Sequence, residues 1–466
     1  MRFFFYISGY CLFFISSFSF SEDISKKQIK NLPIDKNGRN IVISDPTKND
    51  IYKSKNKKTN SDIAPENRPF ITADFTLKLT GERFHNAKLR RGDKKETESE
   101  WGPMLRAQIR TDDDYPLFAF AELEWEKTVS RETGEDTERK TTLDLNQAYL
   151  GINDLLPDGR IRLGRWLFRD EREWLFDENL DGAHARWRHD RWRIEALGGR
   201  VNHWQRDLLD SSTKNDSPVN TGAVLVRRKM ADEWLVGLYG VWQRDTAAQH
   251  DRQLNLGVRS HSNAEEGWRH WLELGMVRGR QSGADLRGYA VDVGATYRLS
   301  QDGSAPRITL GYAWGSGDDG DDDGRRRKHY RQTGLQSNEA TFGGEAKFKI
   351  YGETFDPQLT NMHILTAGVG FNITPRATVD LVYHHYRQDK LAPLADNAAE
   401  LSPRDDQRST RTLGSELDLV VGWEPRDNIK VESAVGWFRP SERFRTPSGP
   451  RSADAYSAWI EVEVGF

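Results

Sequence analysis

Alternating apolar and polar residues recur along most of this chain. In residues 71–80, ITADFTLKLT, every odd position is apolar and every even position is threonine, aspartate or lysine. Residues 289–299 repeat the pattern, and so do the last nine residues, AWIEVEVGF, which end on Phe466. A period of two predicts β-strands that have one apolar face and one polar face. We therefore expect an all-β protein.

The segments between the predicted strands are of two kinds. Short turns such as TPR (374–376) and EPRDN (424–428) contrast with long polar insertions such as residues 315–334. Short turns at one end and long loops at the other are typical of barrels in bacterial outer membranes. At roughly 20 to 25 residues per strand and turn, residues 69–466 would supply on the order of 16 to 18 strands, enough to enclose a channel.

A barrel of this kind turns its apolar faces to lipid and its polar faces to water. Phe466 and the apolar alternates of the last strand would then face lipid, and polar wall residues such as Asp292, Glu416 and Asp418 would need no buried partner. The chain is 36% hydrophobic, which is thin for a soluble sandwich of this length. It also holds 15 Trp, 14 Tyr and 21 Phe, residues that form girdles at both membrane interfaces of such barrels.

The N-terminal part of the chain differs from the rest. Residues 1–21 combine one arginine, an apolar stretch and small residues, which predicts a signal peptide; a membrane anchor is the alternative. Residues 22–68 are polar and lack a period, so we expect a flexible periplasmic leader rather than a small folded cap. The single cysteine, Cys11, lies in the first segment, so the mature chain would have no thiol chemistry.

The charged residues suggest a conduit for an anionic solute. Lys and Arg total 68 and Asp and Glu 71, a near balance that gives no reason to expect nucleic acid as a partner. Residues 159–182, GRIRLGRWLFRDEREWLFDENLDG, are denser, with five arginines between positions 160 and 172. Arginines at a narrow point would bind carboxylates through forked hydrogen bonds, and nearby acids would permit release. The alternative for any one of them is a solvated wall residue.

Several motifs together resemble the bacterial alginate export porin family, from about residue 70 to 466. They are RLGRWLFRDE (162–171), ENLDG (178–182), GYAWGSGDD (311–319), RQTGLQSN (331–338), YGETFDPQLTNM (351–362), VYHHYRQD (382–389), GSELDLVV (414–421) and GWFRP (436–440). The resemblance implies a monomeric barrel of about 18 antiparallel strands in a Gram-negative outer membrane, with long extracellular loops and short periplasmic turns. It implies passive export of an anionic exopolysaccharide through an electropositive conduit partly closed by loops, together with a periplasmic secretion scaffold.

Conduit residues of the family can be carried over where the motifs match. They fall on Lys78, Arg106, Arg162, Arg165, Arg169, Asp177, Asp207, Lys347 and Glu461. Elsewhere the chain departs from the family: Leu167, Asn146, Glu339 and Glu432 stand where the family has arginines. These changes lower the positive charge of the pore. The polymer is therefore expected to be alginate or a less acidic or differently modified relative of it.

Other motifs give weaker evidence for a specific site. Asp319, Asp321 and Asp323 resemble the start of a calcium loop, but Tyr330 stands where the closing glutamate belongs, so a solvated loop is the alternative. His384 and His385 are adjacent on a predicted strand and point to opposite faces. We expect no cofactor and no enzymatic activity. The alternative to export is diffusion or uptake of small acidic solutes.

Overall fold

The computed structural model describes residues 70–89, 95–155, 157–210, 217–231, 233–247, 251–264, 267–299, 306–320, 324–392, 394, 410–441 and 453–466. The predicted signal peptide (1–21) and leader (22–68) lie outside the described residues. Asp321 and Asp323 of the predicted calcium loop lie outside them too. No helix long and apolar enough to cross a membrane occurs in the described ranges.

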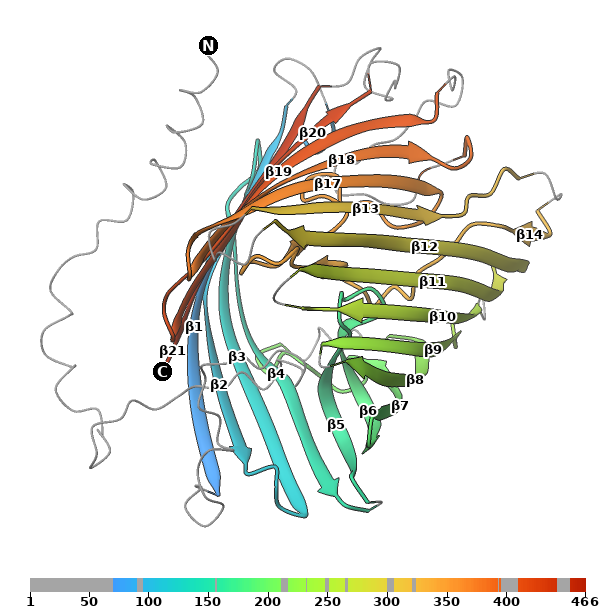
Figure 1. The fold of residues 1–466 in the computed structure, drawn as a ribbon. Coiled ribbons are helices and arrows are strands. Elements are labelled where there is room, and N and C mark those ends of the chain that lie inside the picture. The colour runs from blue at the N-terminus through green and yellow to red at the C-terminus, as the bar shows by residue number, and fades with distance from the viewer. Residues whose placement is uncertain are drawn as a thin grey trace, which may run out of the picture.

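The described residues form β-strands joined by turns and loops (Figure 1). The strands are β1 (Ile71–His85), β2 (Thr97–Thr111), β3 (Leu117–Glu132), β4 (Glu138–Asn153), β5 (Gly159–Arg169), β6 (Asp177–His189), β7 (Trp192–Val201), β8 (Val219–Ala231), β9 (Trp234–Asp245), β10 (Arg252–Ser262), β11 (Trp268–Gln281), β12 (Ala284–Arg298), β13 (Arg307–Gly315), β14 (Arg326–Arg327), β15 (Glu339–Ala340), β16 (Phe348–Lys349), β17 (Met362–Thr374), β18 (Ala377–Gln388), β19 (Thr412–Arg426), β20 (Ile429–Pro440) and β21 (Ala455–Gly465).

Eighteen of these strands close into one antiparallel barrel. Each long strand pairs with the next along the chain, and β13 pairs directly with β17 across the three short strands between them. β21 closes the ring on β1, in a register that runs from Thr76↔Gly465 to His85↔Tyr456. Closure pairs every edge, so a backbone without helices keeps its hydrogen bonds in lipid. The expected all-β barrel is confirmed.

The alternation of the sequence becomes an outer and an inner face. Ile71, Phe75 and Leu79 on β1 are exposed on the outside, whereas Asp74 between them is 6% exposed and faces inward. Phe466 is 61% exposed at the end of the chain, as expected for a lipid-facing residue. Exposed aromatic residues gather near both ends of the strands, as in interfacial girdles: Phe70, Tyr115, Trp192, Trp234, Trp268 and Trp423 at one end, and Trp101, Trp242, Tyr289, Tyr312, Trp437 and Tyr456 at the other.

The two ends of the barrel differ. One end, here called the turn end, holds the start of β1, the end of β21 and short connections such as residues 190–191, 375–376 and 427–428. The opposite end, the loop end, holds longer connections, above all residues 316–361 between β13 and β17. This asymmetry was expected from the sequence.

Two connections fold into the barrel instead of away from it (Figure 1). Residues 170–176 join β5 to β6, and residues 329–361 cross the interior, since Gln332 meets β10 while Glu353 meets β21. Together with the inner faces of the strands they build a buried cluster with Trp174, Phe176, Phe342, Tyr351 and Phe355. Part of the lumen is therefore a packed core, which the alternation of the strands did not predict, although the resemblance implied a conduit partly closed by loops.

Candidate functional site

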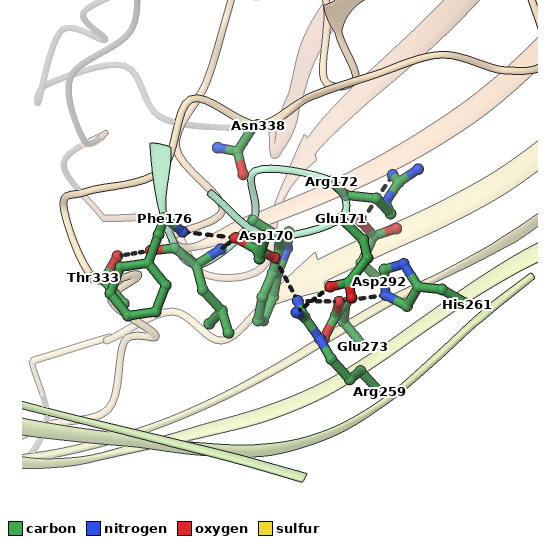
Figure 2. Close-up of polar contacts among 12 residues, drawn as sticks. Asp170, Glu171, Arg172, Phe176, Arg259, His261, Glu273, Asp292, Thr333 and Asn338 are labelled. Carbon is green, nitrogen blue, oxygen red and sulfur yellow. Dashed lines mark hydrogen bonds and ion pairs between the residues drawn. The ribbon is translucent and has the colours of Figure 1, made fainter. Parts of the chain in front are cut away.

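The β5–β6 hairpin supplies the first inward segment. Asp170 shapes its turn, because its Oδ1 accepts the backbone N–H groups of Leu175 at 2.9 Å and Phe176 at 2.7 Å. Gly164 lets β5 lie close against β4, since a Cβ there would meet the backbone oxygen of Ala148 at 2.2 Å. The turn thus enters the barrel as a compact loop with carboxylates and an arginine projecting from it (Figure 2).

Buried ion pairs fasten this loop to the barrel wall. Arg259 of β10 donates to Asp170 at 2.6 Å, to Glu171 at 2.9 Å and to Glu273 of β11 at 2.6 Å (Figure 2). Arg227 of β8 pairs with Glu171 and, at 2.5 Å, with Glu195 of β7. We call these six residues the brace: Asp170, Glu171, Glu195, Arg227, Arg259 and Glu273.

The two loop carboxylates of the brace respond differently to burial. Burial opposes ionisation of the Glu171 carboxyl, but the Arg227 and Arg259 guanidiniums outweigh it and hold the pKa of Glu171 well below its usual range. Burial raises the pKa of Asp170, against the effect of Arg259. Charges this deep are stable only when they are paired and hydrogen-bonded. The brace is a structural device and leaves no open binding site.

Asp292 shows why part of the lumen is closed. Its carboxylate accepts hydrogen bonds from Trp271 Nε1 at 2.7 Å, Tyr351 Oη at 3.0 Å and Arg172 Nη2 at 3.3 Å. Trp174 Nε1 in turn donates to Tyr351 Oη at 2.9 Å. The expectation that Asp292 needs no buried partner is wrong, because the two inward segments cover it.

Glu416 and Asp418 on β19 are covered in the same way. The backbone N–H groups of Thr354 and Phe355 donate to the two carboxylate oxygens of Glu416 at 2.6 and 2.9 Å. Asp418 is fully buried beside them. Here too the expectation of an open aqueous face is wrong, since residues 350–356 lie against β19.

The remaining interior is bordered by half-buried charges. Lys78 Nζ pairs with Glu461 at 2.6 Å between β1 and β21, and Arg106 Nη2 pairs with Glu124 at 3.1 Å between β2 and β3. Each of these two cations keeps about a quarter of its side chain exposed, at 23% and 24%. Lys430 adds a third pair, with Glu432 on β20 at 2.8 Å.

A second arc of charges comes from the hairpin and the long inward segment. Arg169 Nε lies 2.5 Å from Asp177 and 3.1 Å from Glu173. Lys347 Nζ pairs with Glu173 at 2.5 Å, while the Lys347 backbone N–H donates to Glu432 at 2.9 Å. Lys347 therefore links the hairpin to β20.

Amide side chains connect β6 to the charges around Arg106. Asn179 of β6 donates to Asn146 at 2.6 Å, and Asn146 donates to Glu122 at 2.5 Å, which lies 3.9 Å from Arg106. The resulting charge ring joins Lys78, Arg106, Glu122, Glu124, Asn146, Arg169, Glu173, Asp177, Asn179, Lys347, Lys430, Glu432 and Glu461. Its cations keep 23–43% of their side chains exposed and so border water, whereas Glu122, Glu124, Glu173 and Asn179 are buried.

Six of the nine residues carried over from the resemblance meet in this ring: Lys78, Arg106, Arg169, Asp177, Lys347 and Glu461. Arg165 does not. Its side chain is buried, at 2% exposure. Its guanidinium donates to both oxygens of Asp181 at 2.6 and 2.8 Å, to the backbone oxygen of Leu145 at 3.0 Å and to that of Trp204. These bonds occupy the Arg165 guanidinium, which lies outside the charge ring.

Asp207 also lies apart from the ring. It belongs to the connection between β7 and β8, and its Oδ1 accepts the backbone N–H of Leu143 at 3.3 Å. Leu145 N–H donates to Arg206 at 2.9 Å, and Asp207 forms an isolated bridge with Asp144. This connection thus extends the sheet beside β4 on the loop-end side of the β5–β6 pairing, and Asp207 holds it there.

Arg162 belongs to a separate cluster toward the turn end. Its guanidinium lies over the Tyr149 ring, 5.0 Å from the centroid. The register sets Arg160 opposite Arg186, and Arg188 follows on the same face of β6. Sequence analysis missed Arg186 and Arg188; their even spacing with Arg160 and Arg162 across one hairpin was the signal that could have shown them.

The departures from the family pattern have definite places. Asn146 and Glu432 are members of the ring, and Glu339 pairs with Lys349 at 3.1 Å. Leu167 lies on β5, where its backbone N–H donates to Gln147 at 3.0 Å. Acids and an amide thus occupy interior positions where the resemblance implied arginines.

Two groups of carboxylates in the described part of the chain lie beside cations. Asp319 lies 3.8 Å from Lys328 and 3.6 Å from Lys390. Asp112, Asp113 and Asp114 bring carboxylate oxygens within 4.8 Å of one another in the β2–β3 turn, but Asp113 pairs with Arg160 at 2.9 Å.

The comparisons with known proteins agree with this geometry. A family model described as alginate export matches residues 71–457. The chain belongs to the alginate export family. The alginate production protein AlgE of Azotobacter vinelandii is 29% identical over 143 residues, which cover 29% of this chain and only 28% of the relative.

Among solved structures, OccK7 (OpdD) of Pseudomonas aeruginosa superposes with a TM-score of 0.53 at 12% identity, covering 84% of this chain and 99% of that one. OprD of the same organism gives 0.51 at 11% identity, covering 84% and 95%. Likeness at this identity shows the fold alone. Family and fold together place the protein in the Gram-negative outer membrane, so that the turn end faces the periplasm and the loop end the exterior.

Proposed function

We propose that the protein exports an anionic exopolysaccharide, alginate or an alginate-like polymer, by passive passage through the charge ring. The observation that carries this proposal is the ring itself: half-exposed cations of an alginate export family barrel, each already paired with a carboxylate. A uronate carboxylate is chemically equivalent to the carboxylate partner that each cation now holds.

Partner exchange would move the polymer. A sugar carboxylate that enters the ring would replace Glu461 at Lys78, and the displaced Glu461 side chain, which is 24% exposed, would remain hydrated by the lumen. Exposed ion pairs contribute only about 0–1 kcal/mol, so such exchanges cost little. The balance of charge would also prevent tight retention, which conduction requires.

The arginine cluster at the turn end would act before the ring. Arg160, Arg162, Arg186 and Arg188 lie on the periplasmic side, where a secreted polymer arrives. Clustered cations raise the local concentration of an anionic solute. We further expect the barrel to act as a monomer that receives polymer from a periplasmic scaffold.

A second candidate is diffusion or uptake of small acidic solutes. The ring sets five cations against six carboxylates, which favours this candidate, because a ring without excess positive charge need not select a long polyanion. Chain length of the solute separates the two candidates.

The test uses the purified protein in planar bilayers. Polyuronate oligomers of increasing length are added on the periplasmic side while ion conductance is recorded, with neutral dextran oligomers of equal length as controls. Export predicts interruptions of the current that lengthen with polyuronate length and are absent with dextran. Indifference to polyuronates, or equal effects of both polymers, would refute it, and block by monouronates alone would favour the second candidate.

A further inference from the structure

A band of arginines lies on the outside of the barrel, unconnected with the conduit. It consists of Arg244 on β9, Arg252 on β10, Arg278 and Arg280 on β11 and Arg287 on β12. Their outward direction follows from alternation, because their strand neighbours Gln243, Gln253, Val277 and Leu286 are buried on the inner face. We call these five residues the arginine band.

The band begins where the apolar outer surface ends. Trp242, Met276 and Tyr289 are exposed on the outer face at 45%, 36% and 47%, and on each strand the next outward residue toward the loop end is an arginine. Arg278 Nη2 donates to Tyr289 Oη at 3.2 Å, which ties an arginine to an interfacial aromatic residue. The band therefore lies at the level of the lipid headgroups of the outer leaflet.

The strand register sets like charges against one another. Arg244 is opposite Arg252, Arg252 is opposite Arg280, and Arg278 is opposite Arg287. Like charges directly across a sheet are destabilising. One carboxylate faces the band in register, Asp285 opposite Arg280. None of the five arginines forms an ion pair with a carboxylate in the described part of the chain, so their repulsion calls for an external anion.

We propose that the arginine band binds the phosphate groups of the phosphorylated glycolipid of the outer leaflet. The guanidinium fork matches phosphate oxygens in a bidentate manner, and a phosphate between two opposed arginines would convert their repulsion into attraction. The exported polymer fits less well, because the arginines point away from the lumen and directly adjoin the lipid-facing aromatic belt. The site thus anchors one sector of the barrel, β9–β12, to its own leaflet.

The experiment compares lipid binding by native mass spectrometry. Wild-type protein in neutral detergent is incubated with bisphosphorylated lipid A or with the same lipid A after removal of both phosphates. The test variant is Arg278→Gln/Arg287→Gln. The matched control is Arg228→Gln/Arg376→Gln, which removes two arginines at the turn end of the barrel. Arg228 points outward and stacks on Trp192, and Arg376 lies in a turn and pairs with Asp427.

Phosphorylated lipid A should occupy the wild type and the control to a similar degree, and occupancy of the test variant should fall at least five-fold. Dephosphorylated lipid A should bind all three equally weakly. The unfolding temperature gives a second measurement. Without lipid A the test variant should unfold at or above the wild-type temperature, because the repulsion between arginines is removed. With lipid A the unfolding temperature of the wild type should rise more than that of the test variant. If the double variant fails to fold, Arg280→Gln and Arg252→Gln serve singly.

Equal binding of the two lipid forms, or an equal loss in the control, would overturn the proposal. So would a variant that keeps lipid A but loses binding of soluble polyuronate, which would assign the band to the polymer. None of these results depends on whether the ring conducts polyuronates.

Discussion

The brace and the charge ring use the same residue types in the same barrel, yet they differ in access to water. Arg227 and Arg259 of the brace are 7% and 3% exposed, whereas the ring cations keep 23–43% of their side chains exposed. Each brace arginine holds two or three carboxylates from different segments. Each of Lys78 and Lys430 pairs with a single carboxylate on the same or the adjacent strand.

The difference shows how burial changes the energetic cost of breaking an ion pair. A buried charge that loses its partner costs about 3–5 kcal/mol, so the brace fixes the loop 170–176 in place. A half-exposed pair is worth about 0–1 kcal/mol and can exchange partners. Buried ion pairs that keep their partners thus hold the closed part of the lumen. Partly exposed ion pairs that can exchange partners border the part that stays open.

The largest effect is expected at Arg259. Replacing it with methionine leaves Asp170, Glu171 and Glu273 without their common partner, and the free energy of unfolding should fall by about 3–5 kcal/mol. The released loop should also raise single-channel conductance and its noise. Denaturant titration in detergent measures the first effect and bilayer recording the second.

Arg252→Met is the matched control, on the same strand but on the outer face, and should change stability by less than about 1 kcal/mol. If Arg259→Met behaves like Arg252→Met in both assays, the brace does not hold the loop.

Reversal of ring charges should change the ion selectivity of the channel. Lys78→Glu/Arg106→Glu puts four carboxylates at two ring positions, so the channel should shift toward cations by several fold and polyuronate block should weaken. Reversal potentials in a salt gradient measure the shift. Arg325→Gln/Arg326→Gln at the loop end is the comparison and should act mainly at low salt, where screening is weak. An unchanged reversal potential in the ring variant would contradict the conduit assignment.

The fold was readable from the sequence because alternation is local. The opposite faces of residues 71–80 and the outward Phe466 follow from a period of two. The same rule could have separated Arg162 from Arg165, since residues three apart on a strand point to opposite faces. The resemblance named both Lys78 and Glu461 as conduit residues but did not pair them, and no local pattern relates residues from the two ends of the chain.

Burial of Asp292, Glu416 and Asp418 could not be read in this way. Their strands alternate as any wall strand does, and what covers them comes from residues 170–176 and 316–361, polar connections that the composition would leave outside. The fold direction of these connections depends on long-range partners such as Arg259 and Trp271. No local period encodes such partners.

Neutralising acids should sharpen the ring's preference for anions by a smaller amount. Glu339→Gln and Glu432→Gln each remove one negative charge while an amide oxygen remains to accept from Lys349 or from the Lys347 N–H. Anion over cation permeability should rise about two-fold for the pair, since charges near a low-dielectric constriction act more strongly than on an open surface. Asp427→Asn, at a turn and paired with Arg376, is the control. A fall in anion preference would show that these acids do not face the conduit.

The smallest effect concerns pH and the long inward segment. Glu353 lies between β16 and β21, where it accepts the Lys349 N–H at 3.0 Å and Trp459 Nε1–H at 2.9 Å. Burial raises its pKa from 4.5 to about 8, and burial also raises the pKa of Asp356 from 3.8 to about 6, against Lys349. The docked segment therefore holds protons that an undocked one would release. Docking is fully stable below pH 4.5 and is weakened as the pH rises through about 8.

Conductance noise should grow, by less than two-fold, between pH 6 and pH 9. Glu353→Gln should remove the step near pH 8, while Asp356→Asn should remove only the part near pH 6. A step near pH 8 that persists in Glu353→Gln would assign the titration to another group.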